Sequence, residues 1–136
     1  MNFEVLERVR WSDCDPFGII YYGAYIRLFQ VAEEELFREC KLPYTQLREE
    51  RGVWIPRKAI AIEFHSPAQI DEQVAITVHL SRIGNSAMTM QFEVYRASDR
   101  AHRASGTLTV VAVDKATMRP RPIPDEVKKM LSLYAR

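Results

Sequence analysis

Two aspartates, Asp13 and Asp15, are the residues of this sequence that are best placed to do chemistry. They lie in the segment Trp11-Ser12-Asp13-Cys14-Asp15-Pro16-Phe17-Gly18-Ile19-Ile20-Tyr21-Tyr22, where a turn leads into a strongly apolar stretch. Backbone N–H groups at the start of a helix have no partners within the helix and carry partial positive charge. A carboxylate held beside such a start is next to a site for a developing oxyanion. The segment therefore indicates ester or thioester cleavage.

Both aspartates also have a structural explanation. Asp-x-Asp pairs commonly cap turns or helix starts by accepting hydrogen bonds from nearby backbone N–H groups. We expect Asp13 to tie down the loop in this way. A calcium loop needs further oxygen ligands at regular spacing, and Pro16 and Phe17 interrupt that pattern, so we assign no metal.

The remaining reactive side chains point to no second site. Cys14 has no histidine near it in the sequence, and lone cysteines usually behave as small apolar residues. His65, His79 and His102 lack the spacing of metal ligands, so we expect structural or surface positions for them. Two cysteines are too few for a disulfide scaffold and favour a reducing cytoplasm, which is the location we expect.

Composition limits the class of protein. A chain of 136 residues with 47% hydrophobic content can form one domain with a core, so we assign residues 1–136 to a single domain. The net charge is +1 and the 19 basic residues are scattered, so neither a nucleic acid nor an anionic membrane is an expected partner. No window approaches the roughly 20 apolar residues of a membrane-spanning helix, and the amino terminus lacks signal-peptide features. We expect a soluble protein.

Hydrophobic periodicity predicts the elements that must position the loop. Residues 3–10 alternate imperfectly, which favours a first strand, and the loop over 13–22 follows. Residues 22–40 have a helical pattern that is apolar on most sides at first and then on one face. The first half of this helix must therefore be buried. A short second helix is predicted over 44–51, with Gly52 as its stop.

Beyond Gly52 the period of the apolar residues changes to two. Four strands are predicted, at 59–64, 74–81, 88–94 and 105–114. Turn signals at 66–68, 84–86 and 98–100 are short enough to connect antiparallel neighbours. After three prolines, residues 125–134 are typical of a terminal helix, with acids first and lysines later.

This order of elements predicts an α+β fold. An antiparallel sheet of about five strands wrapped around one long central helix is the most economical packing. Such a sheet leaves its edge strands exposed, and pairing edges between two copies of the chain is the usual remedy. We therefore expect at least a dimer.

The loop and several later segments resemble a known family. The segment from Asp13 to Tyr22 looks like the active-site loop of the 4-hydroxybenzoyl-CoA thioesterase family of hot dog fold proteins, with the spacing Asp-x-Asp-x-x-Gly followed by Tyr25. Further matches cover nearly the whole chain and occur at Phe64-His65-Ser66-Pro67, Arg82-Ile83-Gly84-Asn85-Ser86, Gly106-Thr107-Leu108 and Ile123-Pro124.

The resemblance implies hydrolysis of an acyl-CoA thioester. Asp15 matches the catalytic carboxylate of the family, as nucleophile or as general base on water. Tyr22 matches the position whose backbone N–H polarises the thioester carbonyl, and Gly18 matches the glycine that bends the loop. Coenzyme A is part of the substrate, and no further cofactor is implied.

The resemblance also suggests substrate contacts. The family binds phosphate and pantetheine through a strand turn, which here carries Arg82 and Ser86, and through a basic stretch that here carries Arg119 and Arg121. This turn is less basic than in members that act on aromatic substrates. In some branches of the family an acid on the helix acts as the base, so the run 33–35 holds reserve candidates; otherwise these glutamates mark the solvent side of the helix.

Aromatic residues around the helix start are candidates for an acyl pocket. Tyr21 and Tyr25 either line this pocket or pack against the sheet. Trp54 begins a strand that we expect to pass close to the helix start. Because the loop looks closest to the hydroxybenzoyl-CoA branch, we expect an aromatic acyl group, in a cleft between the protomers of a dimer or a dimer of dimers.

Two other functions remain open. The first is a thioesterase for short or medium aliphatic acyl groups, carried on CoA or on an acyl-carrier protein. The second is a non-catalytic acyl-binding hot dog module, against which the presence of Asp15 argues.

Overall fold

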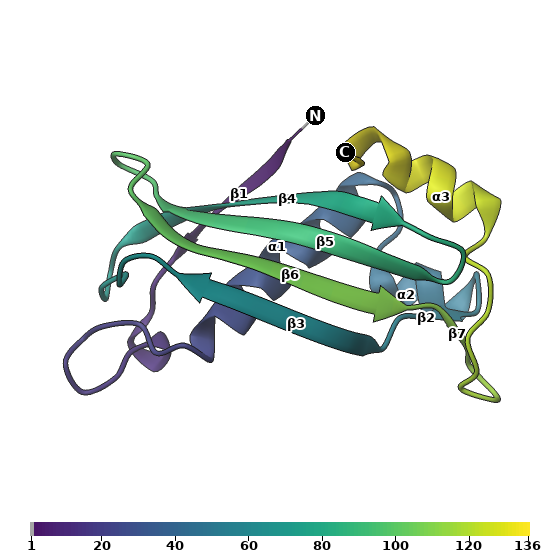
Figure 1. The fold of residues 1–136 in the computed structure, drawn as a ribbon, viewed down its shortest axis with the longest axis horizontal. Helices are drawn as coiled ribbons and strands as arrows, with labels where there is room; N and C mark the ends of the chain where they lie inside the picture. Colours follow the sequence, from purple (N-terminus) through teal and green to yellow (C-terminus); the bar gives the residue numbers. More distant parts are fainter. Residues whose placement is uncertain (1) are drawn as a thin grey trace.

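One antiparallel sheet packed on one long helix dominates the structure (Figure 1). The computed structural model describes residues 2–136. The sheet has the strand order β1-β4-β5-β6-β3, and its strands are β1 (Phe3–Arg8), β3 (Arg57–Phe64), β4 (Gln73–Ile83), β5 (Ala87–Arg96) and β6 (His102–Val111). Helix α1 (Ala24–Glu39) crosses one face of this sheet. The predicted α+β arrangement is confirmed.

The core lies between α1 and the inner face of the sheet. Alternate residues of β5 are buried, and the side chain of Phe92 stacks on Phe29 of α1 with ring centroids 4.6 Å apart. Gly106 on the neighbouring strand allows this approach, because a Cβ atom there would lie 2.4 Å from the Phe29 ring. The glycine therefore sets how closely α1 can pack on β6.

Helix α1 begins later than the sequence pattern indicated. Tyr22 and Gly23 form a turn, and the first helical residue is Ala24 rather than Tyr22. The N–H groups of Ala24, Tyr25 and Ile26 donate to the carbonyl oxygens three residues earlier, so the chain enters the helix through a tight 3₁₀-like turn.

Shorter elements close one end of the sheet. Helix α2 (Tyr44–Glu49) leads into β2 (Val53–Trp54), which pairs with β7 (Val113–Asp114), and helix α3 (Asp125–Leu131) follows. Two 3₁₀ turns complete the set, η1 (Trp11–Asp13) and η2 (Ser132–Tyr134).

The predicted strand 105–114 is in fact two strands, β6 and β7. Ala112 separates them: its N–H donates to the carbonyl of Ser86 (2.7 Å), and its carbonyl accepts from the N–H of Arg121 (2.9 Å). These bonds turn the chain away from the main sheet, so that β7 pairs with β2 instead.

Strand β3 is an unprotected sheet edge. Seven of its eight residues are exposed, and they include Ile60 and Phe64, which are 47% and 54% exposed. Only β6 pairs with this strand within residues 2–136, so one row of its backbone groups is open. In the same residues, no helix has the length and apolar character needed to cross a membrane.

Candidate functional site

The loop that carries the two aspartates folds as a narrow hairpin. The N–H of Asp15 donates to the carbonyl of Ile19 (2.9 Å), and the N–H of Tyr21 donates to the carbonyl of Asp13 (3.0 Å). Gly18 has φ +77°, in the left-handed region that favours glycine, and its N–H donates to the Asp15 carbonyl (3.0 Å). The hairpin therefore connects Asp15 directly to the residues that start α1.

One oxygen of the Asp15 carboxylate is hydrogen-bonded to the backbone and the other is free. Its Oδ1 accepts hydrogen bonds from the N–H groups of Phe17 (2.9 Å) and Ile19 (3.2 Å). Its Oδ2 has no hydrogen bond to any part of the chain that the structure describes, and the residue is half-buried. The carboxylate is thus fixed in orientation with one oxygen available for a substrate or a water molecule.

Asp13 has a different environment. It is 3% exposed, and both of its oxygens bind Arg27 of α1, Oδ1 to Nε (2.8 Å) and Oδ2 to Nη2 (2.6 Å). Its Oδ2 also accepts from the Arg10 N–H (2.8 Å). Burial acts to raise the pKa of Asp13, but the hydrogen bonds and charges of Arg27 and Arg10 outweigh it and lower the pKa. Asp13 ties the loop to the helix, as we expected.

The start of α1 offers unpaired donors. The N–H groups of Tyr22 and Gly23 make no hydrogen bond to other residues within 2–136, because the 3₁₀-like turn uses only their carbonyl oxygens. The side chain of Tyr22 is 76% exposed. This arrangement can stabilise an oxyanion through the backbone.

Asp15 and Tyr22 border separate depressions in one chain. Asp15 lines a depression of about 510 Å³, together with Trp11, Cys14, Pro16, Phe17, Gly18 and Ile70. Tyr22 lines another of about 290 Å³, together with Ile20, Tyr25, Phe64, His65, Ser66 and Pro67. Tyr25 is buried beside Phe64 (ring centroids 5.6 Å apart), and Tyr21 is 46% exposed. Within one chain, Asp15 and Tyr22 therefore line two separate open depressions.

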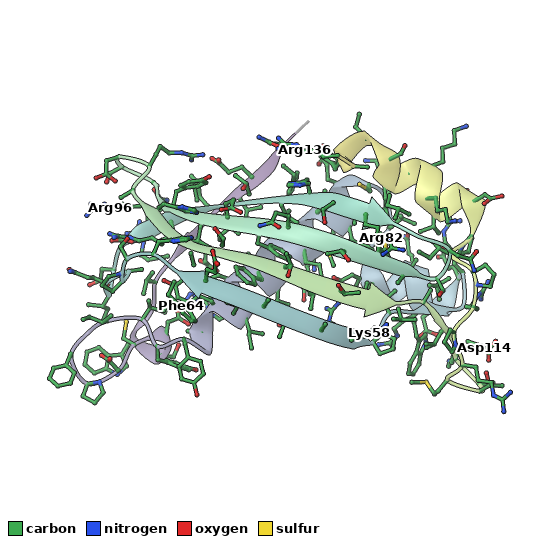
Figure 2. All side chains as sticks on the ribbon, viewed as in Figure 1. Lys58, Phe64, Arg82, Arg96, Asp114 and Arg136 are labelled. Carbon is green, nitrogen blue, oxygen red and sulfur yellow. The ribbon has the colours of Figure 1, made fainter. Side chains whose placement is uncertain are left out.

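The residues predicted to contact coenzyme A gather at the other end of the sheet. Ser86 and Arg121 meet through Ala112, and Arg82 and Arg119 are exposed nearby. Arg121 Nη1 also donates to the carbonyl of Gly52 (3.2 Å). Figure 2 shows Arg82 toward one end of the sheet and Phe64, which lines the depression beside Tyr22, toward the other. Within one chain these predicted contacts are remote from the loop.

Trp54 does not begin the strand that passes the helix start, because it lies in the separate short strand β2, and it is β3 that reaches the helix start at Phe64. Trp54 is in β2, at the end of the sheet that carries α2 and β7 (Figure 1). Its ring lies 5.4 Å from the Arg48 guanidinium and 5.9 Å from the Lys115 ammonium. The chain reaches Trp54 directly after α2 and pairs it with β7 before it enters the main sheet at Arg57.

The interpretation of the glutamates 33–35 as the solvent side of the helix is wrong for Glu33. Glu33 is 1% exposed; its Oε2 accepts from Arg57 Nη1 (2.7 Å) and from the hydroxyl of Tyr44. Burial raises the pKa of Glu33 although Arg57 and Tyr44 act to lower it. Glu33 lies four residues after Phe29 and three residues before Leu36, and this helical spacing places it on the buried face of α1. The spacing could therefore have indicated its burial from the sequence.

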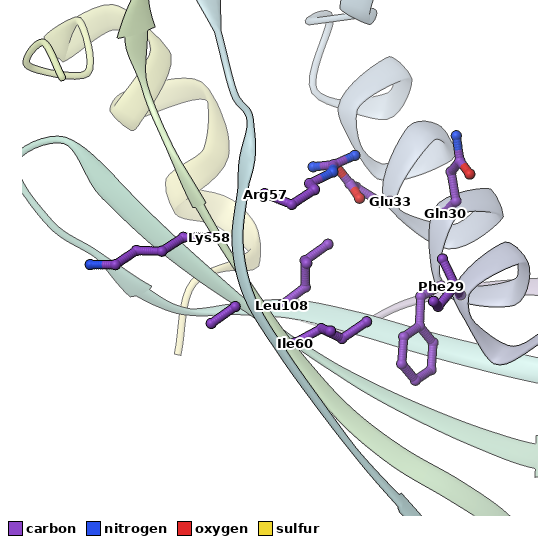
Figure 3. A pocket seen from close by; sticks show the side chains of 9 residues that line it. Phe29, Gln30, Glu33, Arg57, Lys58, Ile60 and Leu108 are labelled. Atoms are coloured by element: carbon purple, nitrogen blue, oxygen red, sulfur yellow. The ribbon is translucent and has the colours of Figure 1, made fainter. Parts of the chain in front are cut away.

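Glu33 lies at a groove between α1 and β3 (Figure 3). The groove has a volume of about 460 Å³ and is lined by Ile26, Phe29, Gln30, Glu33, Arg57, Lys58, Ala59, Ile60 and Leu108. Its lining is apolar along most of its length, with charged side chains from Glu33, Arg57 and Lys58. The sequence analysis missed this groove because it forms between segments far apart in the chain.

The outer face of the sheet carries a polar cluster. The Ser105 hydroxyl donates to Glu93 Oε1 (2.6 Å) and lies 3.0 Å from His65 Nε2, while the rings of His65 and His102 stack 4.2 Å apart. His102 Nε2 lies 2.7 Å from the same Glu93 oxygen. The side chains of this cluster therefore satisfy each other's hydrogen-bonding groups. Among the residues described, no group of three or more acids, histidines or cysteines is arranged to hold a metal ion.

The sequence matches the thioesterase-like superfamily over residues 9–131. It is 27% identical over 127 residues to an acyl-CoA thioesterase, YbgC, from Haemophilus influenzae, covering 93% of this chain and 92% of that one. It is 21% identical over 136 residues to a 1,4-dihydroxy-2-naphthoyl-CoA hydrolase from Nostoc punctiforme, covering 100% of this chain and 90% of the other.

The fold also matches solved structures. The chain superposes on a 1,4-dihydroxy-2-naphthoyl-CoA thioesterase from Synechocystis with a TM-score of 0.89. The match covers 97% of this chain and 96% of the other at 15% identity. The hot dog fold is thereby confirmed.

Proposed function

Because the chain belongs to the thioesterase-like superfamily, we propose that it cleaves acyl-CoA thioesters with Asp15 as the reacting carboxylate and the Tyr22 N–H as the oxyanion donor. Membership of this superfamily and the acyl-CoA thioesterases among its relatives make the chain an acyl-CoA thioesterase of the hot dog family. The roles of individual residues and the acyl group are the proposal. We also propose the cytoplasm as its location, since Cys14 and Cys40 are both free thiols.

The observation that carries the residue assignment is the half-free carboxylate of Asp15 on the hairpin that leads to an unpaired Tyr22 N–H. As nucleophile, an Asp15 oxygen forms a bond to the thioester carbon, the C–S bond breaks, the CoA thiolate leaves, and water hydrolyses the anhydride. As general base, Asp15 takes a proton from the water that attacks. In both routes the Tyr22 N–H stabilises the oxyanion.

A dimer formed through β3 supplies the missing half of the site. Two β3 strands paired antiparallel about a two-fold axis set the Arg57 end of one strand beside the Phe64 end of the other. The end that carries Trp54, Arg82 and Arg121 then approaches the partner's catalytic loop. This arrangement accounts for predicted site residues that lie at opposite ends of one chain, and it hides the exposed apolar edge of β3.

The first candidate for the acyl group is an aromatic acid of the hydroxybenzoyl type. Its support is the cluster of Tyr21, Tyr22 and Tyr25 at the helix start, together with relatives that are named for an aromatic acyl-CoA. The groove between α1 and β3 favours a second candidate, an elongated aliphatic acyl group, because apolar side chains line most of its length.

Thiol release from a panel of CoA esters tests the function. The panel contains benzoyl, 4-hydroxybenzoyl, naphthoyl, octanoyl and decanoyl esters. We expect Asp15→Asn to lower kcat about a thousandfold or more while the fold is retained, because the change removes the reacting charge with little change in volume. The matched control is Asp71→Asn, the same change at an exposed turn position. Asp71→Asn is expected to keep wild-type turnover.

Each outcome of this assay decides a separate point. Rapid, Asp15-dependent cleavage of the aryl esters supports the first acyl candidate, and preference for decanoyl supports the second. Near-normal turnover in Asp15→Asn contradicts the residue assignment. Tight binding without cleavage of any ester, including a carrier-protein thioester, contradicts a catalytic role and favours an acyl-binding module.

A further inference from the structure

The groove between α1 and β3 has a charged end with an unsatisfied acceptor. Both hydrogen bonds of the Glu33 carboxylate, from Tyr44 and Arg57, are accepted by Oε2, whereas Oε1 is buried and has no partner. Over residues 2–136, one other buried side-chain polar atom lacks a partner, the indole Nε1–H of Trp54. Arg57 lies between these two unpaired atoms. It lines the groove together with Glu33, and it lines a neighbouring depression together with Trp54. An unpaired buried acceptor is costly and indicates a group that the chain itself does not supply.

The groove runs along α1 from Ile26, which is four residues after Tyr22, to this acceptor. Ile26, Phe29 and Glu33 recur at intervals of three and four residues and lie on one side of α1, which begins just after Tyr22 and Gly23. A helix rises about 1.5 Å per residue, so roughly 13 Å separates Ala24 from Glu33 along α1. A thioester carbonyl held by the Tyr22 N–H therefore directs an acyl group along Ile26 and Phe29 toward Glu33. A single benzene ring is too short to span this length.

We propose that the acyl group of the substrate lies in this groove and carries a hydroxyl at its far end, which Glu33 and Arg57 bind. The hydroxyl donates its hydrogen to Glu33 Oε1 and accepts a hydrogen bond from the Arg57 guanidinium. Arg57 is long and its side chain is 42% exposed, so it can rotate to admit the hydroxyl. This inference rests on the proposed function and narrows its substrate class.

The charges at this end exclude other terminal groups. A carboxylate would meet the buried acid Glu33, and an ammonium would meet the Arg57 guanidinium, while the Lys58 side chain points away from both (Figure 3). A terminal methyl would leave Oε1 without a partner. A hydroxyl has one donor and two acceptor lone pairs, so it satisfies both Glu33 and Arg57 without adding charge.

Matched pairs of CoA esters test the proposal. The first pair, decanoyl and 10-hydroxydecanoyl, differs by a hydroxyl remote from the thioester. The second pair, benzoyl and 4-hydroxybenzoyl, differs by a hydroxyl close to it. We expect kcat/KM of the wild type to be about tenfold or more higher for 10-hydroxydecanoyl than for decanoyl, because a site built to bind a hydroxyl discriminates against its absence. The second pair is expected to show no preference that depends on Glu33.

Two variants show which residue provides the discrimination. Glu33→Met keeps the length of the side chain and removes the acceptor, so the ratio for the decanoyl pair should fall to about one. Glu35→Met makes the same change at an exposed position of the same helix and should keep the wild-type ratio. Circular dichroism verifies that both variants are folded. The kcat/KM ratio of the wild type for the decanoyl pair tests the proposal by itself. The test therefore remains valid even if Glu33→Met fails to fold.

Binding of non-hydrolysable thioether analogues, measured by calorimetry, separates this inference from the proposed function. Hydrolysis that depends on Asp15, with equal rates and equal analogue affinities for both decanoyl esters, overturns the inference alone and assigns water or the partner subunit to Oε1. Glu33-dependent preference for the hydroxylated analogue, without hydrolysis, supports the inference and overturns the function. A preference that survives in Glu33→Met, or a Glu33-dependent preference for 4-hydroxybenzoyl, overturns the assignment.

Discussion

Asp13 and Arg27 form an ion pair with two hydrogen bonds between the loop that carries Asp15 and the first half of α1. The bonds measure 2.8 Å and 2.6 Å, and Asp13 is 3% exposed. Arg27 Nη1 also donates to Glu7 Oε2 of β1 (2.9 Å). One guanidinium therefore holds the loop, the helix and the edge strand together, and this fixes where Asp15 sits relative to the start of α1.

Replacing Arg27 by Gln should destabilise the protein at neutral pH. Asp13 would keep a buried charge without its main partner, which corresponds to a loss of about 2 to 3 kcal/mol in the free energy of unfolding. Arg38→Gln is the matched control, because Arg38 pairs with the exposed Glu35, and exposed pairs contribute about 0.5 kcal/mol. Urea unfolding of both variants at pH 7 measures the difference. Equal losses in the two variants would contradict the role of Asp13.

The same comparison in acid tests the charge of Asp13. Its pKa lies below the ordinary value of 3.8 in the folded protein, so its stabilisation is present above that value and is lost as the pH falls through the lowered pKa. The difference between wild type and Arg27→Gln should therefore narrow below about pH 4. A constant difference down to pH 2 would show that the pair does not depend on ionised Asp13.

Gly18→Ala should impair activity more than the matched change at Gly52. Both glycines have positive φ, +77° and +64°, and an added Cβ at either has its nearest contact at 3.8 Å, so the cost is backbone strain rather than a clash. Each variant should lose about 1 to 2 kcal/mol of stability. Because Gly18 closes the hairpin under Asp15, only Gly18→Ala should also lower kcat. Thermal melts and thiol release on both proteins decide this, and equal kcat values would refute a role for the hairpin geometry.

The sequence allowed the sheet, the central helix and the loop to be predicted because each has a local signal. Alternation over residues 88–94 and the apolar run after Tyr22 follow directly from side-chain periods of two and 3.6. The split after Val111 had no such signal, because the hydrogen bonds of Ala112 to Ser86 and Arg121 depend on tertiary contacts.

The candidate site was predicted in part for the same reason. Asp15 and Gly18 lie in a short loop whose geometry is encoded locally. The burial of Glu33 depends on contacts with Tyr44 and Arg57, which are 11 and 24 residues away in the chain. The position of Trp54 was misjudged because it depends on the pairing of β2 with β7.

Tyr22→Ala and Tyr22→Pro should separate the backbone of Tyr22 from its side chain. If the backbone N–H is the oxyanion donor, removing the exposed ring should lower kcat less than tenfold, whereas proline removes the N–H and should cost about 10²- to 10³-fold. Proline is tolerated at the entry of a helix, so the fold should persist. Thiol release and circular dichroism on both variants test this. A severe loss in Tyr22→Ala would transfer the role to the side chain.

A charge on the inner side of the β3 edge should weaken the proposed dimer. Ile60→Asp and Phe64→Asp put a carboxylate on exposed apolar positions of this strand. Leu6→Asp is the control, since Leu6 is 57% exposed on β1, the opposite edge. Analytical ultracentrifugation should show a dimer for wild type and Leu6→Asp, and dissociation for the two β3 variants. Dissociation of Leu6→Asp alone would move the interface to β1.

Replacing Glu33 by Gln should stabilise the protein increasingly as the pH rises above about 4.5, the ordinary pKa of a glutamate. Burial raises the pKa of Glu33 in the folded state, so the folded protein holds this proton more tightly than the unfolded chain does. The contribution of Glu33 to stability is complete below the unfolded pKa and is lost as the pH rises through the folded pKa. Glu33→Gln has no such loss.

Urea unfolding of wild type and Glu33→Gln from pH 4 to pH 8 measures this difference. The groups that face Glu33 are Arg57, Tyr44 and Glu34, and all three are present in both proteins, as is Asp13, so their titrations largely cancel. The free energy of unfolding of wild type should fall relative to the variant across this range. A relative rise instead would mean that the hydrogen bonds from Arg57 and Tyr44 outweigh burial and lower the pKa of Glu33.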